Sequence, residues 1–269
     1  MAQAGRRRAT LVLVRSDQRG ALTDLAWREY IDRFHAERAG VTEAVFGHLE
    51  GGSAAVHRWV QEAIPAPGAV LDVACGSAPM VGELTGGWVG VDRVTAELAL
   101  ARRRGAPRVV VGDASALPVR DVSFDTVVCS MALMLLQPLD RALREMTRVL
   151  RPGGRLVALA PDARPLTLRN RARYARLLVA LRRRRIGYPN DLAGVDVALR
   201  AAGLELISDD RRRFACRIDR PETATLFVES LYLPSVDPDR LAAANTVAQR
   251  WVGTTIGIPL RRLVAVASG

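Results

Sequence analysis

Three aspartates follow apolar, strand-forming runs at nearly equal spacing. Asp72 lies in "AVLDVA" (69–74), Asp92 ends "WVGVD" (88–92) and Asp113 ends "RVVVGD" (108–113), roughly 20 residues apart. Because the carboxyl ends of parallel strands meet at one edge of a sheet, we expect the three carboxylates to face one crevice. There they can accept hydrogen bonds from ligand hydroxyls such as those of a ribose. A single strand-end aspartate is commonly a turn or capping residue, so the binding interpretation depends on all three together.

A loop of small residues, "CGSA" (75–78), follows the first of these runs. Small side chains let the backbone approach a ligand closely. A dinucleotide fingerprint has three glycines around a pyrophosphate, whereas Gly76 is the single glycine of this loop. A nicotinamide-dependent oxidoreductase is therefore the weakest of the functions that we consider.

The central part of the chain alternates strand-like and helix-like segments. Two further apolar runs, 124–130 and 155–160, follow those that carry the aspartates. Between them, apolar residues recur at helical spacing until "PGG" (152–154) ends the pattern. Strands rich in Val, Leu and Ala throughout indicate a parallel sheet buried on both faces. The predicted fold class is α/β, a doubly wound sheet that binds ligands at the carboxyl ends of its strands.

Both flanks of this alternation are mainly helical in pattern. Residues 22–64 have helical spacing with a break at "EGGSA" (50–54). After residue 160 we expect an Arg-rich helix at 164–186, an amphipathic helix at 191–203, a strand at 204–218, helices near 221–232 and 238–252, and a last strand at 258–267. No Gly/Ser/Pro linker divides the chain. We predict a single domain, with a helical cap segment at 1–64 and a core at 65–269 that carries an insertion at about 163–190.

Residues 65–160 resemble the class I S-adenosylmethionine (SAM)-dependent methyltransferases. "VLDVACGSA" resembles their first motif, "GVDRV" their ribose-binding acid, and "GDASALP" their adenine-recognition segment. "FDTVVCSMALMLL" and "REMTRVLRPGGRLVALAP" resemble their fourth strand, next helix and fifth strand. The resemblance implies a Rossmann-like, doubly wound, seven-stranded sheet with an N-terminal helical cap and a helical insertion after strand five. It also implies SAM as the cofactor, with these candidate binding residues: Tyr30, Asp72, Ala74, Cys75, Gly76, Ser77, Asp92, Arg93, Asp113, Ala114, Ser130 and Met131.

Two residues depart from the family's first motif. Ala74 and Ala78 stand where the family has its outer glycines. Alanine is the smallest alternative to glycine and is accommodated there if φ stays negative. The loop then still passes close to the methionine part of SAM. Since SAM has no phosphate, it does not need the third glycine and helix N-terminus that a dinucleotide uses.

The segment after the fourth strand bears on the acceptor. Methyltransferases that modify nucleic-acid bases commonly have "(N/D)-P-P-(Y/F)" there, whereas this chain has "CSMALM" (129–134). That favours a small-molecule acceptor, plausibly in bacterial specialised metabolism. His35 is the first candidate for a general base, ahead of His48 and His57, and Tyr30 could close over the SAM site. The alternatives are an RNA or other macromolecule methyltransferase, and a SAM-binding cyclase or sensor that transfers no methyl group.

The chain is strongly basic, with a net charge of +11 and 39 basic residues, all of them arginine. A GC-rich genome explains this, as does an anionic partner. For the Arg-rich helix we weigh a solvated face first, then an anion-recognising lid, then an RNA contact. One face of this helix is an apolar stripe made of Leu168, Ala172, Ala175 and Val179. We rank a membrane surface last, because no Trp or Phe anchors this stripe. Homodimerisation is open.

The cysteines and the short apolar runs argue against a disulfide-rich, metal-binding, secreted or membrane-spanning protein. The three cysteines and three histidines lie apart, which argues against a disulfide framework and against a metal site. No stretch is long enough for a signal-peptide core or a membrane span, and we expect a cytoplasmic protein.

Overall fold

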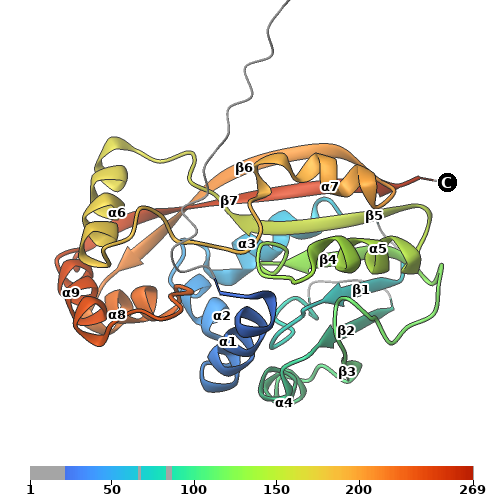
Figure 1. The fold of residues 1–269 in the computed structure, drawn as a ribbon, viewed down its shortest axis with the longest axis horizontal. Coiled ribbons are helices and arrows are strands. Elements are labelled where there is room, and N and C mark those ends of the chain that lie inside the picture. Colours follow the sequence, from blue (N-terminus) through green and yellow to red (C-terminus); the bar gives the residue numbers. More distant parts are fainter. Residues whose placement is uncertain (1–21, 66–67, 83–86, 269) are drawn as a thin grey trace, which may run out of the picture.

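The structure is a computed structural model that describes residues 22–65, 68–82 and 87–268. These residues form one seven-stranded sheet of order β3-β2-β1-β4-β5-β7-β6. The strands are β1 (Val70–Val73), β2 (Trp88–Asp92), β3 (Val109–Val111), β4 (Phe124–Ser130), β5 (Leu150–Pro161), β6 (Leu204–Ile218) and β7 (Thr254–Ala267). β1 to β5 pair in parallel, and β7 pairs antiparallel with both β5 and β6 (Figure 1). The predicted doubly wound, seven-stranded sheet is confirmed.

Helices bury both faces of the sheet, which explains why its strands are almost wholly apolar. Alternate strand residues, such as Val70 and Val128, join one core with the helices α3 (Gly52–Gln61) and α4 (Thr95–Arg103). Their neighbours, such as Leu71 and Val127, join the other core with α5 (Leu139–Val149) and α7 (Val195–Ala201). The α5 helix ends at Val149, and β5 begins at Leu150, before the "PGG" stop, because Leu150 pairs with Phe124 of β4.

The last two strands are longer than the rest of the sheet. β7 pairs with β5 only over Leu260–Val266, and its first part pairs with β6 alone. The helices α6 (Leu168–Ala180), α8 (Pro221–Glu229) and α9 (Pro238–Gln249) gather around this extension (Figure 1, left). We call these helices and the outer ends of β6 and β7 the C-terminal lobe.

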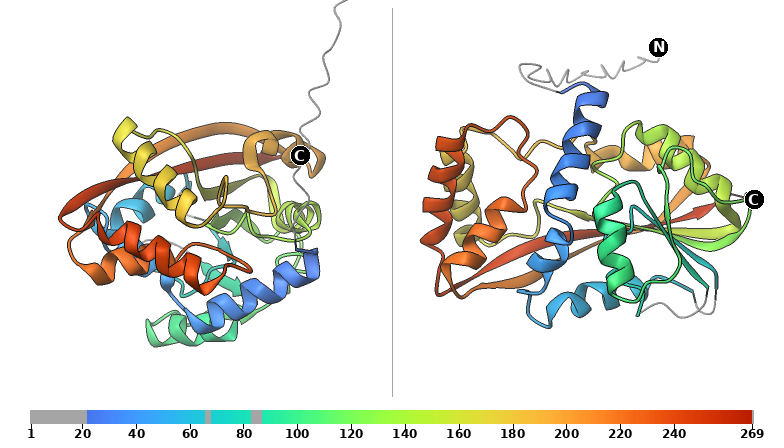
Figure 2. Two further views of the ribbon diagram at one scale, coloured as in Figure 1. Left: turned by 60° about the vertical axis from the view of Figure 1, so that its left-hand side comes forward. Right: turned by 90° about the horizontal axis from the view of Figure 1, so that it is seen from below.

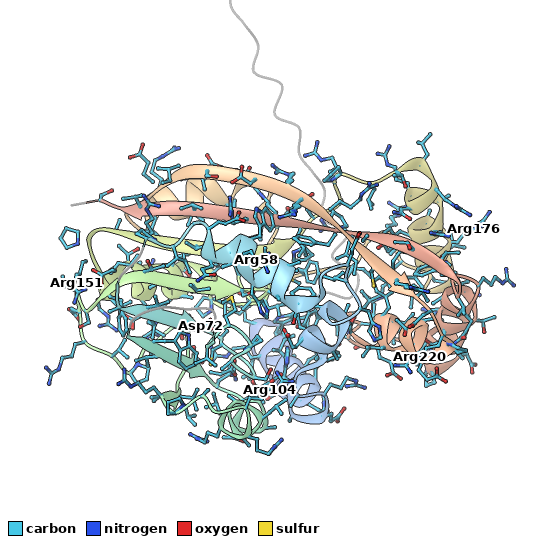
Figure 3. All side chains as sticks on the ribbon, turned by 180° about the vertical axis from the view of Figure 1, so that it is seen from behind. Arg58, Asp72, Arg104, Arg151, Arg176 and Arg220 are labelled. Atoms are coloured by element: carbon cyan, nitrogen blue, oxygen red, sulfur yellow. The ribbon has the colours of Figure 1, made fainter. Side chains whose placement is uncertain are left out.

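The Arg-rich segment forms a shorter helix than its sequence predicts. α6 begins after Thr167, whose hydroxyl accepts a hydrogen bond from the backbone N–H of Asn170, and it ends at Ala180. The apolar stripe faces solvent, since Leu168 is 82% and Val179 is 75% exposed. Arg176 also points away from the molecule (Figure 3). Its position favours the solvated face that we ranked first.

The N-terminal helices are α1 (Asp24–Glu37), α2 (Val41–Phe46) and α3, so the helical pattern breaks at Gly40 as well as at 50–54. Gly40 has a φ of 78°, a left-handed conformation that glycine adopts without strain. α1 lies between α4 and the C-terminal lobe (Figure 2, right). It therefore crosses the edge of the sheet at which the parallel strands end. Among the described residues, no helix has the length and apolar character to cross a membrane.

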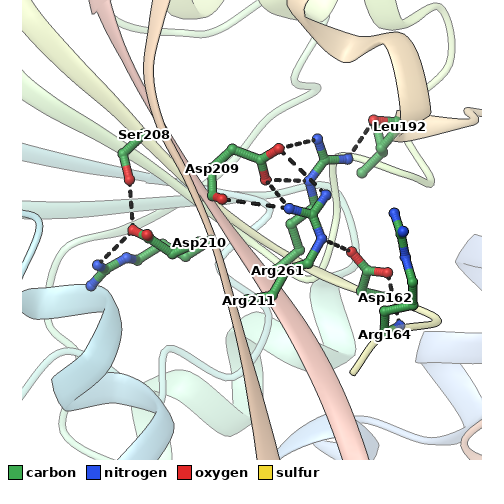
Figure 4. Close-up of polar contacts among 9 residues, drawn as sticks. Asp162, Arg164, Leu192, Ser208, Asp209, Asp210, Arg211 and Arg261 are labelled. Carbon is green, nitrogen blue, oxygen red and sulfur yellow. Dashed lines mark hydrogen bonds and ion pairs between the residues drawn. The ribbon is translucent and has the colours of Figure 1, made fainter. Parts of the chain in front are cut away.

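A buried arginine ties the long strands to the α/β core. The Arg261 guanidinium on β7 is 7% exposed and donates two hydrogen bonds to Asp209 of β6, at 2.7 and 2.9 Å. It also donates to the carbonyl of Leu192, while Arg211 joins Asp209 to Asp162 (Figure 4). A two-pronged arginine–carboxylate contact of this kind fixes geometry as well as charge.

We expect Asp209→Ala to lower the free energy of unfolding by about 1–3 kcal/mol, because it leaves a buried guanidinium without its carboxylate. Asp140→Ala is the matched control, since the Asp140–Arg144 pair on α5 is solvent-exposed. Denaturant unfolding of both variants measures the difference. Equal midpoints for the two variants would show that the Arg261 contact contributes nothing.

Candidate functional site

Two adjoining cavities open at the carboxyl edge of the sheet, with volumes of about 110 and 70 Å³. Both are lined by Ala74, Gly76, Ser130 and Met131. The larger one is also lined by His35, Asp92, Arg93, Asp113 and Ala114, and the smaller one by Asp72, Cys75 and Ser77. The structure thus brings together the residues that the sequence singles out, except Tyr30 and His48, which line neither cavity. No residue of 163–190 lines either cavity, which leaves the anion-recognising lid without support.

Asp92 fixes the geometry of the site. One carboxylate oxygen accepts the backbone N–H of Gly76 at 2.8 Å, and the other accepts that of Val94 at 2.8 Å. The side chain thereby joins the loop after β1 to the turn between β2 and α4. Burial raises the pKa of Asp92, although these two backbone hydrogen bonds lower it in part. Each oxygen keeps a lone pair for a ligand hydroxyl.

The loop after β1 adopts a strained path, and the condition of negative φ at its two alanines is not met. Ala74 and Ala78 have φ values of 56° and 53°, and Gly76 lies between them at 53°. The chain must turn sharply after β1 for the N–H of Gly76 to reach Asp92, and this turn uses left-handed residues. An alanine in this conformation costs about 1–2 kcal/mol. Met131, after β4, has a φ of 58°, so a second wall of the cavities carries similar strain.

Asp72 is the most unusual carboxylate of the site. It is 1% exposed and lies on β1, within the sheet (Figure 3). Its Oδ1 atom has no hydrogen-bond partner among the described residues. Burial, together with the charge of Asp92, raises its pKa to about 8. A buried carboxylate that has one unpartnered oxygen beside a cavity is stabilised by a cationic ligand.

Asp113 closes the other end of the larger cavity. Its Oδ1 atom accepts hydrogen bonds from the N–H and hydroxyl of Ser115, and its Oδ2 atom pairs with Arg28 of α1. Partial burial opposes ionisation, but the contacts with Ser115 and Arg28 hold the pKa of Asp113 below its ordinary value. Arg93 pairs with Asp32 of α1 at 2.5 Å. α1 is thus held over the cavity by ion pairs.

His35 joins two groups that the sequence does not single out. Its Nδ1 atom lies 2.9 Å from a carboxylate oxygen of Glu97, and its Nε2 atom lies 3.0 Å from the Tyr232 hydroxyl. His57 instead pairs with Glu43 beside the smaller cavity, at 3.3 Å. Of the three candidate histidines, His35 alone lines the larger cavity.

Tyr30 lines neither cavity. Its hydroxyl accepts the backbone N–H of Leu233 at 2.8 Å, and its ring packs against Trp27 and Phe34. In this conformation the residue joins α1 to the segment after α8.

Arg28, Glu97 and Tyr232 are site residues that the sequence analysis missed. A signal existed for Arg28, because Arg28, Asp32 and His35 share one face of a helix at i, i+4 and i+7. No local signal marks Tyr232, which follows α8 and is placed by long-range packing. Glu97 is hidden among ordinary helix residues of α4.

Comparison with known proteins supports the interpretation of the central segment. Residues 71–158 match the model of a methyltransferase domain. Demethylmenaquinone methyltransferase of Mycolicibacterium paratuberculosis is 46% identical over 91 residues, which are 33% of this chain and 39% of the relative. The match therefore spans about two fifths of the length of such relatives.

Solved structures share the fold over nearly the whole chain. The [4+2]-cyclase SpnF is 21% identical with a TM-score of 0.62, covering 92% of this chain and 98% of its own. A Haemonchus contortus phosphoethanolamine N-methyltransferase 2, solved with SAM, is 17% identical with a TM-score of 0.56, covering 93% and 61%. The fold is that of the class I SAM-dependent methyltransferases.

We expect Ala74→Gly to raise the free energy of unfolding by about 0.5–1 kcal/mol, since glycine removes the left-handed strain at a cost in backbone entropy. Ala69→Gly is the control, because Ala69 precedes β1 and has no positive φ. The free energy of unfolding of the Ala69→Gly variant should fall by about 0.5–1 kcal/mol. Denaturant unfolding measures the stability of both variants. A loss of stability in Ala74→Gly would contradict the inference that Ala74 is strained.

The raised pKa of Asp72 gives a signed pH dependence. Between about pH 4 and pH 8 the folded protein holds a proton on Asp72 that the unfolded chain has lost, so stability falls as pH rises through this window. Asp72→Asn removes that dependence. We expect this variant to melt about 3 °C or more above the wild type at pH 8.5, with a smaller gap at pH 5. Thermal melts that run parallel at both pH values would contradict the assignment, and Asp140→Asn serves as the exposed control.

Proposed function

We propose, on the premise that residues 71–158 form a class I methyltransferase domain, that this protein transfers a methyl group from SAM to a small-molecule acceptor. The observation that carries the proposal is the convergence of Asp72, Asp92 and Asp113 with the loop after β1 on one pair of cavities. Three carboxylates, of which those of Asp72 and Asp92 are buried, suit a ligand that has a sulfonium, an ammonium and two ribose hydroxyls.

The residues present fit SAM at each of its parts. Asp92 offers lone pairs to the ribose hydroxyls. Asp113 and Ala114 line the cavity where the resemblance expects adenine. The unpartnered oxygen of Asp72 beside Gly76 suits the positive charge of the methionine part. When bound, SAM supplies an electrophilic methyl carbon.

The chain's own part in the reaction is positioning and proton handling. Holding two reactants in line is the main source of rate in such a displacement, and a cavity closed to water helps it. α1 covers the cavity through the contacts of Arg28 and Asp32. Ser130 and Met131, where the two cavities meet, face both. His35 is the proposed base that accepts a proton from the acceptor.

A small-molecule acceptor fits the site better than RNA. The arginines of α6 line neither cavity, and Arg176 points outward from the C-terminal lobe (Figure 3). The curated relatives include a demethylmenaquinone methyltransferase, whose acceptor is a small molecule. Incubating the protein with labelled SAM and total RNA tests the alternative, because label in RNA would overturn the small-molecule proposal.

One observation favours a second candidate. The [4+2]-cyclase SpnF shares this fold over 92% of the chain, with a TM-score of 0.62. A cyclase would bind SAM or its product tightly and consume none of it. SAM turnover with an acceptor panel separates the two functions.

The first test is calorimetric titration with SAM, S-adenosylhomocysteine and, as a control, NAD. We expect the first two to bind and NAD to give no heat. Asp92→Ala should weaken SAM binding by about 1.5–3 kcal/mol, or roughly 10- to 150-fold, the scale of lost hydrogen bonds to a charged group. Asp121→Ala, 70% exposed in its side chain and remote from the cavities, should bind normally. Unchanged affinity in Asp92→Ala would remove the ribose assignment.

A further inference from the structure

Three side chains from separate elements form a continuous hydrogen-bonded chain into the larger cavity. Glu97 comes from α4, His35 from α1, and Tyr232 from the segment after α8. The two links measure 2.9 and 3.0 Å. His35 and Tyr232 line the larger cavity, whereas Glu97, with its side chain 4% exposed, lines the smaller one. Residues so far apart in sequence are not linked by local helix geometry.

The partners of Glu97 fix the direction of this chain. Its two oxygens accept the backbone N–H of Gly40, at 3.1 and 3.0 Å, as well as facing His35. An ionised carboxylate only accepts, so the Nδ1 atom of His35 must donate to it. In a neutral imidazole the Nε2 atom is then the acceptor, and the Tyr232 hydroxyl donates to it.

Tyr232 can relay a proton but does not hold a charge. Burial raises the pKa of its hydroxyl far above the ordinary value, although the Thr42 side chain of α2 lowers it in part. The phenol therefore stays protonated. It passes a proton to His35 only as it receives another from the cavity side.

The charged groups around His35 come from several elements. Asp92 at the end of β2 and Glu97 on α4 are the nearby acids. Both arginines that line the larger cavity are paired, Arg93 with Asp32 of α1 and Arg28 with Asp113. The other groups around Tyr232 are the neutral phenols of Tyr30 and Tyr188. A proton that arrives on His35 thus meets two carboxylates.

We propose that Tyr232 and His35 relay a proton from an ionisable hydroxyl of the acceptor, with Glu97 as the residue that positions His35. This inference rests on the proposed function and names its substrate class: a phenol, an enol or another acidic hydroxyl compound, methylated on oxygen or on the carbon that the enolate activates. Amines with a free electron pair need no such relay.

The step balances for a hydroxyl acceptor. The acceptor O–H bond breaks, its proton moves to the Tyr232 hydroxyl oxygen, and the Tyr232 proton moves to the Nε2 atom of His35. The acceptor keeps the electron pair and forms a bond to the methyl carbon. The carbon–sulfur bond breaks, and its electron pair stays on sulfur. His35, with 18% of its side chain exposed, then releases the proton to water.

The relay has a readout that needs neither SAM nor an acceptor. Nitrogen NMR of the protein labelled with ¹⁵N-histidine reports which ring nitrogen carries the proton. At pH 8 we expect His35 to hold its proton on Nδ1, whereas free imidazole side chains favour Nε2. Tyr232→Phe should shift the Nε2 signal of His35, and Tyr188→Phe, which changes a ring only 6.3 Å from Tyr232, should not. His35 protonated on Nε2 would overturn the relay.

The second readout is methyl transfer from labelled SAM to a panel of matched phenols, enolisable ketones and amines. We expect label in the hydroxyl and enol compounds. His35→Gln and Tyr232→Phe should lower kcat/KM by about 10²- to 10⁴-fold. Glu97→Gln should have a smaller effect. Tyr188→Phe is the matched control with an unchanged rate.

Calorimetry separates a failed relay from a failed function. SAM should bind the Tyr232→Phe variant within about threefold of the wild type, because the variant loses one oxygen that the relay alone uses. Absence of SAM binding to the wild type would defeat the proposed function while leaving the NMR result on the tautomer standing. Normal SAM binding with label in amines, or in none of the panel, would overturn the relay and its substrate class.

Discussion

The geometry of the site depends on the two backbone hydrogen bonds that Asp92 accepts. The carboxylate holds the N–H of Gly76 and the N–H of Val94, and so ties the loop after β1 to the start of α4. Everything at the carboxyl edge is placed relative to that tie. α4 carries Glu97, Glu97 holds Gly40 and His35, and these in turn set the position of α1. A buried carboxylate with several donors is a costly group that becomes stable only when each donor is in place.

The site has groups that lower the stability of the empty protein. Ala74, Ala78 and Met131 have positive φ, and Asp72 is buried with an unpartnered oxygen. Backbone strain and unsatisfied charge of this kind are found mainly at ligand-binding sites. A cation bound beside Asp72 would satisfy that oxygen and favour its ionised form. The stability that the free protein gives up at this edge is thus recovered when the ligand binds.

The sequence predicts the fold and the cofactor half of the site, but not the acid–base half. Near-continuous apolar runs, each ending at a polar residue, are local signals, and they located the first four strands within about two residues and Asp72, Asp92 and Asp113 at one edge. The φ values of the two alanines were missed because they follow from where the Gly76 N–H must point, which composition does not reveal. Tyr232 was missed because its place depends on the packing of α8 against α2 and on the Tyr30 contact with Leu233. Tertiary packing of this kind leaves no periodic trace in the sequence.

The candidate site has residues inside and outside the segment that matches known methyltransferases, so the comparisons inform only part of it. The methyltransferase-domain match covers residues 71–158, which supply Asp72, Asp92, Asp113 and Glu97. His35 lies before it, on α1, and Tyr232 lies after it, beyond β6. The groups that would meet the acceptor therefore come from outside the matched segment, where the curated relatives give no guidance. A shared cofactor site joined to different flanking helices can carry different acceptors, or a reaction that consumes no SAM, on one sheet. For this chain the flanking helices bring a carboxylate, an imidazole and a phenol into line, and that arrangement suits an acceptor whose hydroxyl must lose its proton before the new bond can form.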